Sequence, residues 1–316
     1  MRSREVALQN GGRPRSRSVH LAAVFAISAF FGLFGPGVGK LKEKRNTSGL
    51  ALALEDKDPE VEYRAAEALG DIGDEKSVGP LIAAMTRSEY SGVRWKAAEA
   101  LSKIGDPAVG PLITLLQHPD DDVRWQAAIA LGEIGNPDAI EPLIVLMADG
   151  DRYVRSRAAN ALGLIGKPAV RRLTDVLRDG PVNARCGAAA ALGQTQEPDA
   201  IEPLISALAD PETEVRVEAA SALAVIGRPA TGSLIKFLKF TGGERRVEVV
   251  RALGQLNASD AIEPLVQILE NADDRERQEV ADALDAILAA EVRPVVARIR
   301  SGNNDNNGTG TQTRTG

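Results

Sequence analysis

The sequence predicts an all-α fold, an α-solenoid (superhelix) of about eight two-helix repeats, each 30–32 residues long. Two series of leucines recur at that interval and are offset from each other by about half of it. Proline and glycine recur at fixed distances from these leucines, which is typical of short helices separated by turns. No stretch alternates polar and apolar residues as a strand does.

The chain starts with a basic extension, residues 1–20, and continues with an apolar segment, residues 21–39. Residues 1–45 contain nine lysines and arginines against two acidic residues, and no charge occurs from 21 to 39. A basic stretch before an apolar run is typical of a signal sequence or a membrane anchor. The most apolar part, "LAAVFAISAFFGLF", is shorter than the ~20 residues that a spanning helix needs. A hydrophobic cap on the first helix is the alternative, and both interpretations stay open.

The solenoid is expected over residues 40–301, with two helices in each repeat. One leucine series belongs to the first helices: Leu50, Leu81, Leu112, Leu143, Leu173, Leu204, Leu234 and Leu265. The other series, here called the anchor leucines, belongs to the second helices: Leu69, Leu101, Leu131, Leu162, Leu192, Leu223, Leu253 and Leu284. Alanines three and four residues before most anchors lie on the same helical face, so these faces are expected to form the core.

Helix boundaries can be predicted from the residues around the leucines. Prolines that suit the first turn of a helix mark where the first helices start: Pro80, Pro111, Pro142, Pro203 and Pro264. Residues that tolerate a left-handed conformation end the second helices: Gly73, Gly105, Gly135, Gly166, Gly227 and Asn257. Aspartates placed to cap the second helices precede them: Asp58, Asp120, Asp151 and Asp273.

An arginine occurs seven residues before most anchor leucines, close to the core side of the second helix. The members of this arginine ladder are Arg94, Arg124, Arg155, Arg185, Arg216, Arg246 and Arg277. A buried guanidinium needs a partner, and loop aspartates of neighbouring repeats are expected to supply it. The ladder is therefore interpreted as structural.

The charge balance argues against a nucleic-acid partner. Residues 46–301 hold 28 basic and 41 acidic residues, which is unfavourable for a phosphate-binding surface. Residues 302–316 contain nothing to bury and are expected to be a disordered tail. Cys186 is the only cysteine, which excludes an intramolecular disulfide and is compatible with a reducing compartment. A cytoplasmic location is expected, with membrane association through residues 21–39 as the open alternative.

The unit "VRWQAAIALGEIGNPDAIEPLIVLM", residues 123–147, resembles the HEAT-like repeat of the phycobilin (PBS) lyase family. The resemblance covers roughly residues 49–300 and implies a solenoid of HEAT-like repeats. For function it leaves bilin lyases, deoxyhypusine hydroxylase and protein-binding scaffolds open. Deoxyhypusine hydroxylase binds its iron through His-Glu pairs, and this sequence contains no such pair. The resemblance therefore does not support the hydroxylase activity.

Residues suited to catalysis or metal binding are scarce. The chain has two histidines, His20 and His118, and the acids beside the second are better explained as a helix cap. Phosphate-binding and dinucleotide-binding loops and the nucleophile-elbow motif are missing from the sequence. We therefore expect no catalytic residues, no metal site and no cofactor.

An aromatic row is the strongest candidate for a binding site. Only 3% of the residues are aromatic, yet Tyr63, Trp95 and Trp125 occupy the same position, six residues before the anchor, in successive repeats. They are expected to line the inner surface, with Tyr153 on the same side. Exposed aromatic side chains in a row are typical of protein-binding surfaces, although each ring could instead cover a neighbouring side chain.

A mixed polar rim is expected around this row, followed by an acidic surface at Glu218, Glu248, Glu279 and Asp282. The predicted protein-binding residues are Tyr63, Arg64, Trp95, Lys96, Glu99, Trp125, Tyr153 and Asn160. The resulting hypothesis is a non-catalytic scaffold that binds another protein or peptide on its inner surface. The alternative is an enzyme, or an enzyme subunit, of the bilin lyase or hydroxylase type.

Overall fold

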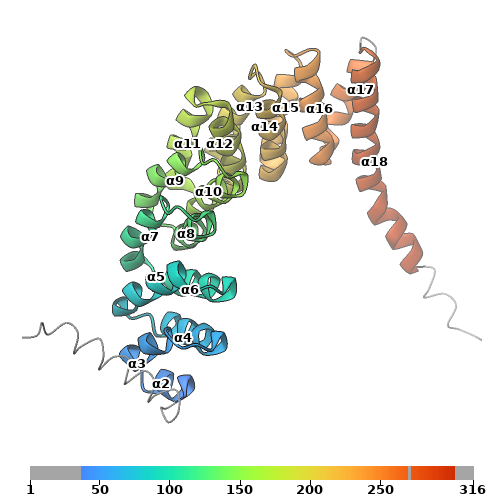
Figure 1. Ribbon diagram of the computed structural model, residues 1–316. Helices are drawn as coiled ribbons and strands as arrows, with labels where there is room; N and C mark the ends of the chain where they lie inside the picture. The colour runs from blue at the N-terminus through green and yellow to red at the C-terminus, as the bar shows by residue number, and fades with distance from the viewer. Residues whose placement is uncertain (1–36, 270–271, 303–316) are drawn as a thin grey trace, which may run out of the picture. The chain divides into compact units, whose positions relative to one another are not determined.

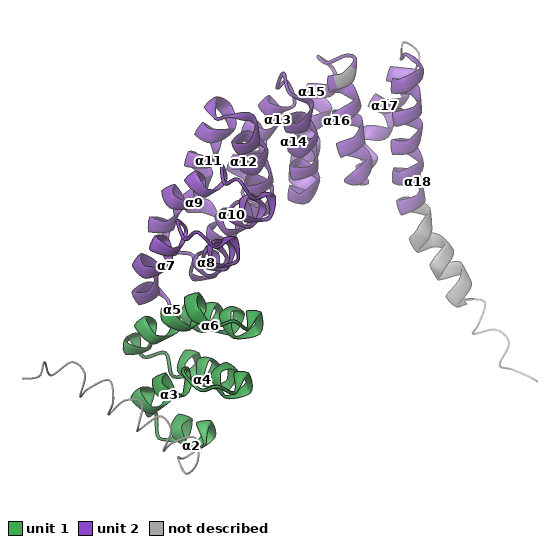
Figure 2. Ribbon diagram, viewed as in Figure 1, with its two compact units in different colours: residues 1–104 green, residues 105–316 purple. Residues whose placement is uncertain are grey.

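A computed structural model describes residues 37–269 and 272–302 of the chain, and over these residues it contains helices and no strands (Figure 1). The predicted all-α solenoid of two-helix repeats is confirmed. The chain divides into two compact units, residues 1–104 and 105–316 (Figure 2). Each unit is described by itself below.

The expected localisation, cytoplasmic with a membrane contact through residues 21–39, is corrected by the structure. Within residues 37–269 and 272–302, no helix combines the length and the apolar character that crossing a bilayer requires. Residues 38–39 instead start a short helix that carries two lysines, Val38–Glu43. Residues 1–36, with most of the apolar segment, lie outside the described residues, and so does the expected tail from 303 onward.

Unit 1 consists of a short leading helix and two helix pairs. The leading helix is α2 (Val38–Glu43), and the pairs are α3 (Thr47–Ala53) with α4 (Pro59–Ile72), and α5 (Val78–Arg87) with α6 (Ser91–Ile104). The second helices α4 and α6 pack against each other, and α2 contacts α4. A 3₁₀ turn, η1 (Glu75–Ser77), leads into α5.

Unit 2 continues with six helix pairs over its described residues. The pairs are α7 (Val109–Leu115) with α8 (Asp121–Ile134), α9 (Ile140–Leu146) with α10 (Arg152–Ile165), α11 (Lys167–Asp179) with α12 (Val182–Thr195), α13 (Ile201–Ala207) with α14 (Thr213–Ile226), α15 (Thr231–Leu238) with α16 (Glu244–Gln255), and α17 (Ile262–Leu269) with α18 (Asp274–Gly302). The second helices, α8 to α18, stack in chain order.

The two leucine series form the core of each unit, as predicted. All eight first-helix leucines are fully buried, and so are the anchor leucines from Leu69 to Leu253. Leu284, the last anchor, is only half-buried in α18. Each fully buried leucine contributes roughly 2–3 kcal/mol by leaving water, so the stacked leucines account for much of the stability.

The predicted helix boundaries are confirmed in part. Gly105, Gly166 and Gly227 have positive φ but ψ values of −138°, −137° and −150°, which lie outside the left-handed helical region. Gly73, Gly135 and Asn257 have φ values of 70°, 74° and 48°, the left-handed conformation that ends a helix. Asp58 and Asp151 accept hydrogen bonds from the N–H groups of Glu60 and Val154. The prolines, however, are the third residue of their helices, and a 3₁₀ turn precedes each of these helices: η1 before α5, η2 (Asp106–Ala108) before α7, η3 (Pro137–Ala139) before α9, η4 (Pro198–Ala200) before α13 and η6 (Ser259–Ala261) before α17.

Successive second helices approach closely where a glycine follows the anchor leucine. A Cβ atom added to Gly132 on α8 would lie 2.7 Å from Cα of Ala161 on α10. The same contact occurs between Gly193 and Ala222 in unit 2 and between Gly70 and Ala100 in unit 1. No real Cβ tolerates such a distance, so glycine sets the spacing of these helices.

Candidate protein-binding surface

Most members of the arginine ladder join a second helix to a loop, as expected, whereas Arg277 is exposed and pairs with Asp274 on its own helix. Arg124 on α8 donates to both carboxylate oxygens of Asp149, and Arg185 on α12 does the same to Asp210. Arg155 uses loop carbonyls instead, donating to the backbone oxygens of Asp149 and Gly150. Arg124 and Arg185 therefore connect successive repeats, while Arg155 ties its helix to the loop of its own repeat.

In unit 1, three predicted site residues meet at the contact between α4 and α6. Nζ of Lys96 lies 5.1 Å from the ring centroid of Tyr63, in position for a cation–π interaction. The same Nζ donates to Oε2 of Glu99 at 2.6 Å. That hydrogen bond raises the pKa of Lys96 and lowers the pKa of Glu99, with burial opposing both shifts. Lys96 is only 8% exposed, so it lies beneath the expected rim rather than on it.

The charges of unit 1 continue from this contact toward α2. Lys103 lies 3.3 Å from Glu99 and 3.0 Å from Asp71, and Lys42 on α2 lies 2.6 Å from Asp71. The hydrogen bonds from Lys42 and Lys103 lower the pKa of Asp71. Trp95, the aromatic residue of α6, is 40% exposed. On α6, unit 1 thus presents the exposed ring of Trp95 beside a network of paired charges.

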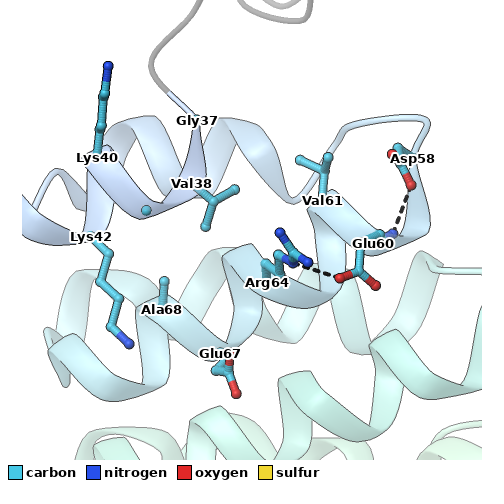
Figure 3. Close-up of a pocket in the computed structure, with 11 residues that line it drawn as sticks. Gly37, Val38, Lys40, Lys42, Asp58, Glu60, Val61, Arg64, Glu67 and Ala68 are labelled. Carbon is cyan, nitrogen blue, oxygen red and sulfur yellow. Dashed lines mark hydrogen bonds and ion pairs between the residues drawn. The ribbon is translucent and has the colours of Figure 1, made fainter.

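Arg64, also predicted as a site residue, lies at a separate pocket between α2 and α4 (Figure 3). The pocket has a volume of about 640 Å³ and includes the apolar side chains of Val38 and Val61. Nε of Arg64 donates to Glu60 at 2.6 Å on the same helix. Both groups are largely exposed, so this pair contributes little to stability.

In unit 2, Trp125 and Tyr153 form a T-shaped pair between α8 and α10. Their ring centroids are 5.3 Å apart and the ring planes are 87° from parallel. Nε1 of Trp125 donates to Oδ1 of Asp122 at 2.9 Å, which fixes the indole. Tyr153 remains 49% exposed, and the guanidinium carbon of Arg157 lies 4.7 Å from its ring centroid. The tyrosine is therefore held by contacts with an indole ring and a cation.

Asn160 is further along α10 and does not join this cluster. Its Nδ2 donates to Oε1 of Gln194 on α12 at 3.1 Å. The predicted residues thus form two groups, with Tyr63, Lys96 and Glu99 in contact in unit 1 and Trp125 with Tyr153 in contact in unit 2. Each group belongs to one unit.

The sequence matches the family model for HEAT repeats over residues 47–114, 109–185 and 170–245. The model for the PBS lyase HEAT-like repeat matches residues 245–271. The chain belongs to the HEAT-repeat family. A search of curated proteins gave no match.

Among solved structures, the HEAT-repeat protein resembles human deoxyhypusine hydroxylase in complex with glycerol, at 22% identity and a TM-score of 0.36, over 80% of this chain and 99% of the other. It also resembles the complex of CpcE and CpcF of phycocyanin lyase from Nostoc sp. PCC7120, at 26% identity and a TM-score of 0.37, over 76% and 94% of the two chains. An engineered protein matches at 25% identity and a TM-score of 0.33, over 80% and 81%. At these TM-scores, the family assignment rests on the sequence matches alone.

The acidic surface expected along unit 2 of the HEAT-repeat protein is only partly there. Glu248 is 3% exposed, and Arg251 lies 2.6 Å from it and 2.7 Å from Glu279. Asp282 accepts a hydrogen bond from Gln278. Arg251 therefore balances charges that the sequence interpretation had left exposed.

Glu218 differs from Glu248 and Glu279, because no arginine pairs with it within the described residues. It is half-buried, and no hydrogen bond or ion pair reaches it within the described part of the chain. Burial raises its pKa above the ordinary 4.5. Cys186 on α12 lies nearby. Burial is the main cause that raises the pKa of its thiol, and the negative charge of Glu218 is the second. The thiol is therefore mostly protonated at neutral pH and poorly nucleophilic.

Sequence reasoning missed Arg157 and Arg251 in the HEAT-repeat protein. Arg157 follows Tyr153 by four residues on a helix, a spacing that brings side chains together and could have indicated the cation–π contact. Arg251 lies three residues after Glu248 and two before its anchor leucine, a position occupied by Glu67 and Glu99 in the first repeats. Within residues 37–269 and 272–302, no three His, Cys, Asp or Glu side chains gather as metal ligands would.

Proposed function

We propose that this HEAT-repeat protein is a non-catalytic scaffold that binds another protein or peptide through the exposed side of its second helices. The observation that carries the proposal is the cluster of Trp125, Tyr153 and Arg157. Its central ring is about half exposed although neighbours on two sides fix its orientation. Trp95 with the Lys96–Glu99 pair is the corresponding contribution of unit 1.

The physical basis is the low cost of ordering such a surface when a partner binds. A tyrosine that is already held by an indole and a guanidinium loses little side-chain entropy on binding. Its exposed area is then available to a partner, and aromatic and arginine side chains dominate the energy of most protein interfaces. Arg157 adds a cation that can accept a carboxylate or a backbone oxygen from the partner.

The enzyme alternative predicts a different property of the purified chain. A bilin lyase would carry or transfer a chromophore, and a hydroxylase of the kind named above would bind iron. Absorbance spectra and metal analysis of the purified full-length protein therefore come first. A stoichiometric chromophore or iron would contradict the scaffold proposal.

The direct test is affinity capture from native lysate with the full-length chain and the double variant Trp95→Ala/Tyr153→Ala. The matched control is Tyr90→Ala, which removes a ring that is 49% exposed but lies in the loop before α6. We expect the double variant to lose partners that the parent and the control both retain, while circular dichroism shows equal helicity. Capture of the same proteins by all three chains would contradict the proposed surface.

A further inference from the structure

Residues five positions before the anchor leucines form a row across the second helices. Its members are Arg64, Lys96, Gln126, Arg157, Gly187, Glu218, Glu248 and Glu279. Most charged members have a partner in the structure: Arg64 with Glu60, Lys96 with Glu99, and Glu248 and Glu279 with Arg251. Arg157 and Glu218 are the exceptions within the described residues.

Arg157 on α10 is half-buried without a carboxylate beside it. Its Nε is shielded from solvent and, over the described residues, has no hydrogen-bond acceptor. Its guanidinium carbon lies 4.7 Å from the centroid of the Tyr153 ring, a cation–π contact. A buried donor without an acceptor is costly, so an incoming carboxylate would gain more here than at an exposed arginine.

Glu218 on α14 is the opposite case, a half-buried carboxylate without a cation. Within the described residues, no cation forms a hydrogen bond or an ion pair with its carboxylate. Burial alone raises its pKa, so no compensating charge reaches it within the described part of unit 2. A cation from outside would satisfy it.

These two unsatisfied charges flank α12, which contributes no side chain to the row. Gly187 stands at that position, and Sδ of Met147 fills the space where a Cβ would be. Leu164 on α10 and Val225 on α14, each seven residues after the charged residue, are 56% and 53% exposed. The surface from α10 to α14 thus has a positive end and a negative end, and an exposed apolar residue lies about two helical turns further along each of these two helices.

The spacing of the helices indicates the shape of the ligand. Packed helices lie about 8–10 Å apart, so Arg157 and Glu218 are separated by roughly 20 Å, or two helix spacings. A polyproline-II segment advances ~9.3 Å per turn of three residues, so every third side chain meets the next helix. Two turns therefore span the distance from α10 to α14.

We propose that unit 2 binds an extended peptide segment with opposite charges about six residues apart, an acidic side chain on Arg157 and a basic one on Glu218. This inference rests on the proposed function, because it specifies the chemistry of the partner on the same surface. The residue midway between the two charges faces Gly187.

The test is a selection of phage-displayed random peptides on the immobilised full-length chain. Enriched peptides are expected to carry an acid and a base about six positions apart, in one fixed order. The double variant Arg157→Glu/Glu218→Lys is then expected to enrich peptides with the order reversed. Matched controls are Arg171→Glu and Glu263→Lys, exposed charges on the first helices α11 and α17 that should leave the selection unchanged.

The outcomes separate this inference from the proposed function. Peptides that bind but show no charge pattern, or that keep the same order with the double variant, would overturn the inference and leave the scaffold proposal standing. No enrichment of any peptide would overturn the inference, whereas the affinity capture described above decides the scaffold proposal independently.

A second measurement covers the case in which the double variant fails to fold. Glu218→Gln removes the charge with little change in size and should weaken a selected peptide about tenfold. Replacing the basic residue of that peptide by glutamine should weaken binding by the same factor, with no further loss when both changes are combined. Fully additive losses would overturn the pairing.

Discussion

Arg124 and Asp149 form a two-point ion pair between one second helix and the loop that precedes the next. Nε of Arg124 lies 2.8 Å from Oδ2 and its second terminal nitrogen 3.0 Å from Oδ1. The two side chains are 16% and 12% exposed. Asp149 also accepts the N–H of Asp151 and offers its carbonyl to Arg155, so one residue connects α8, the loop and α10.

Asp149→Asn is expected to destabilise the protein by about 2–3 kcal/mol, because a half-satisfied guanidinium stays buried. Urea denaturation followed by circular dichroism measures the change. The control is Asp175→Asn, which affects a carboxylate that is 40% exposed and pairs only with exposed arginines on α11. Equal losses of unfolding free energy in the two variants would show that burial of the Arg124–Asp149 pair does not increase its contribution to stability.

The same pair should make stability depend on pH in the acid range. Burial raises the pKa of Asp149, but the hydrogen bonds from Arg124 and from the N–H of Asp151 together lower it below the ordinary 3.8. The unfolded chain therefore binds the proton more tightly, so the stabilisation is complete above pH ~4 and is lost as the pH falls through the folded-state pKa.

The measurement is the stability difference between the parent and Asp149→Asn, followed from neutral pH to about pH 3. We expect the difference to shrink on acidification. A difference that stays constant over this range would mean that the folded-state pKa of Asp149 is not lowered.

Gly132→Ala should destabilise the protein by about 1–3 kcal/mol, because the added Cβ collides with the backbone of α10. Gly110→Ala on α7 is the matched control, since nothing lies within 4 Å of its Cβ position. There the lower entropy of the unfolded chain should give a change between zero and about 1 kcal/mol of stabilisation. Thermal melts compare the two, and a stabilised Gly132→Ala variant would contradict the close approach.

Truncation of a buried leucine and of an exposed leucine on neighbouring second helices should cost very different amounts of stability. Leu131→Ala opens a cavity in the core of unit 2 and should cost about 2–5 kcal/mol, whereas Leu164→Ala removes a side chain that is 56% exposed and should cost less than about 0.5 kcal/mol. Chemical denaturation of both variants provides the test. Similar losses would show that Leu164 packs against the repeat more than its exposure indicates.

The fold could be predicted because its determinants are periodic and local. The anchor leucines, the left-handed glycines and the capping aspartates each depend on residues a few positions away, so one sequence contains the information.

The candidate site was harder to predict from the sequence, because it depends on which side chains of neighbouring helices contact each other. A helical wheel places Lys96 on the rim, but the Tyr63 ring of the preceding second helix covers it. Glu248 was expected on an acidic surface, yet Arg251 draws it into a buried ion pair. The importance of Arg157 arises from the absence of a carboxylate nearby in the described residues, and no single-helix pattern shows such an absence.

The positions at which the chain can be truncated without loss of stability depend on which repeat supplies the partners of the ladder arginines. Arg124 and Arg185 take their carboxylates from the following repeat, while Arg155 donates to carbonyls within its own. A fragment that ends at Ile134 therefore lacks the carboxylate partner of Arg124, and a fragment that ends at Thr195 lacks that of Arg185. A fragment that stops at Ile165 keeps the Arg124–Asp149 pair whole. Boundaries drawn by repeat length alone would miss this difference, and a stable truncation has to follow the ion pairs.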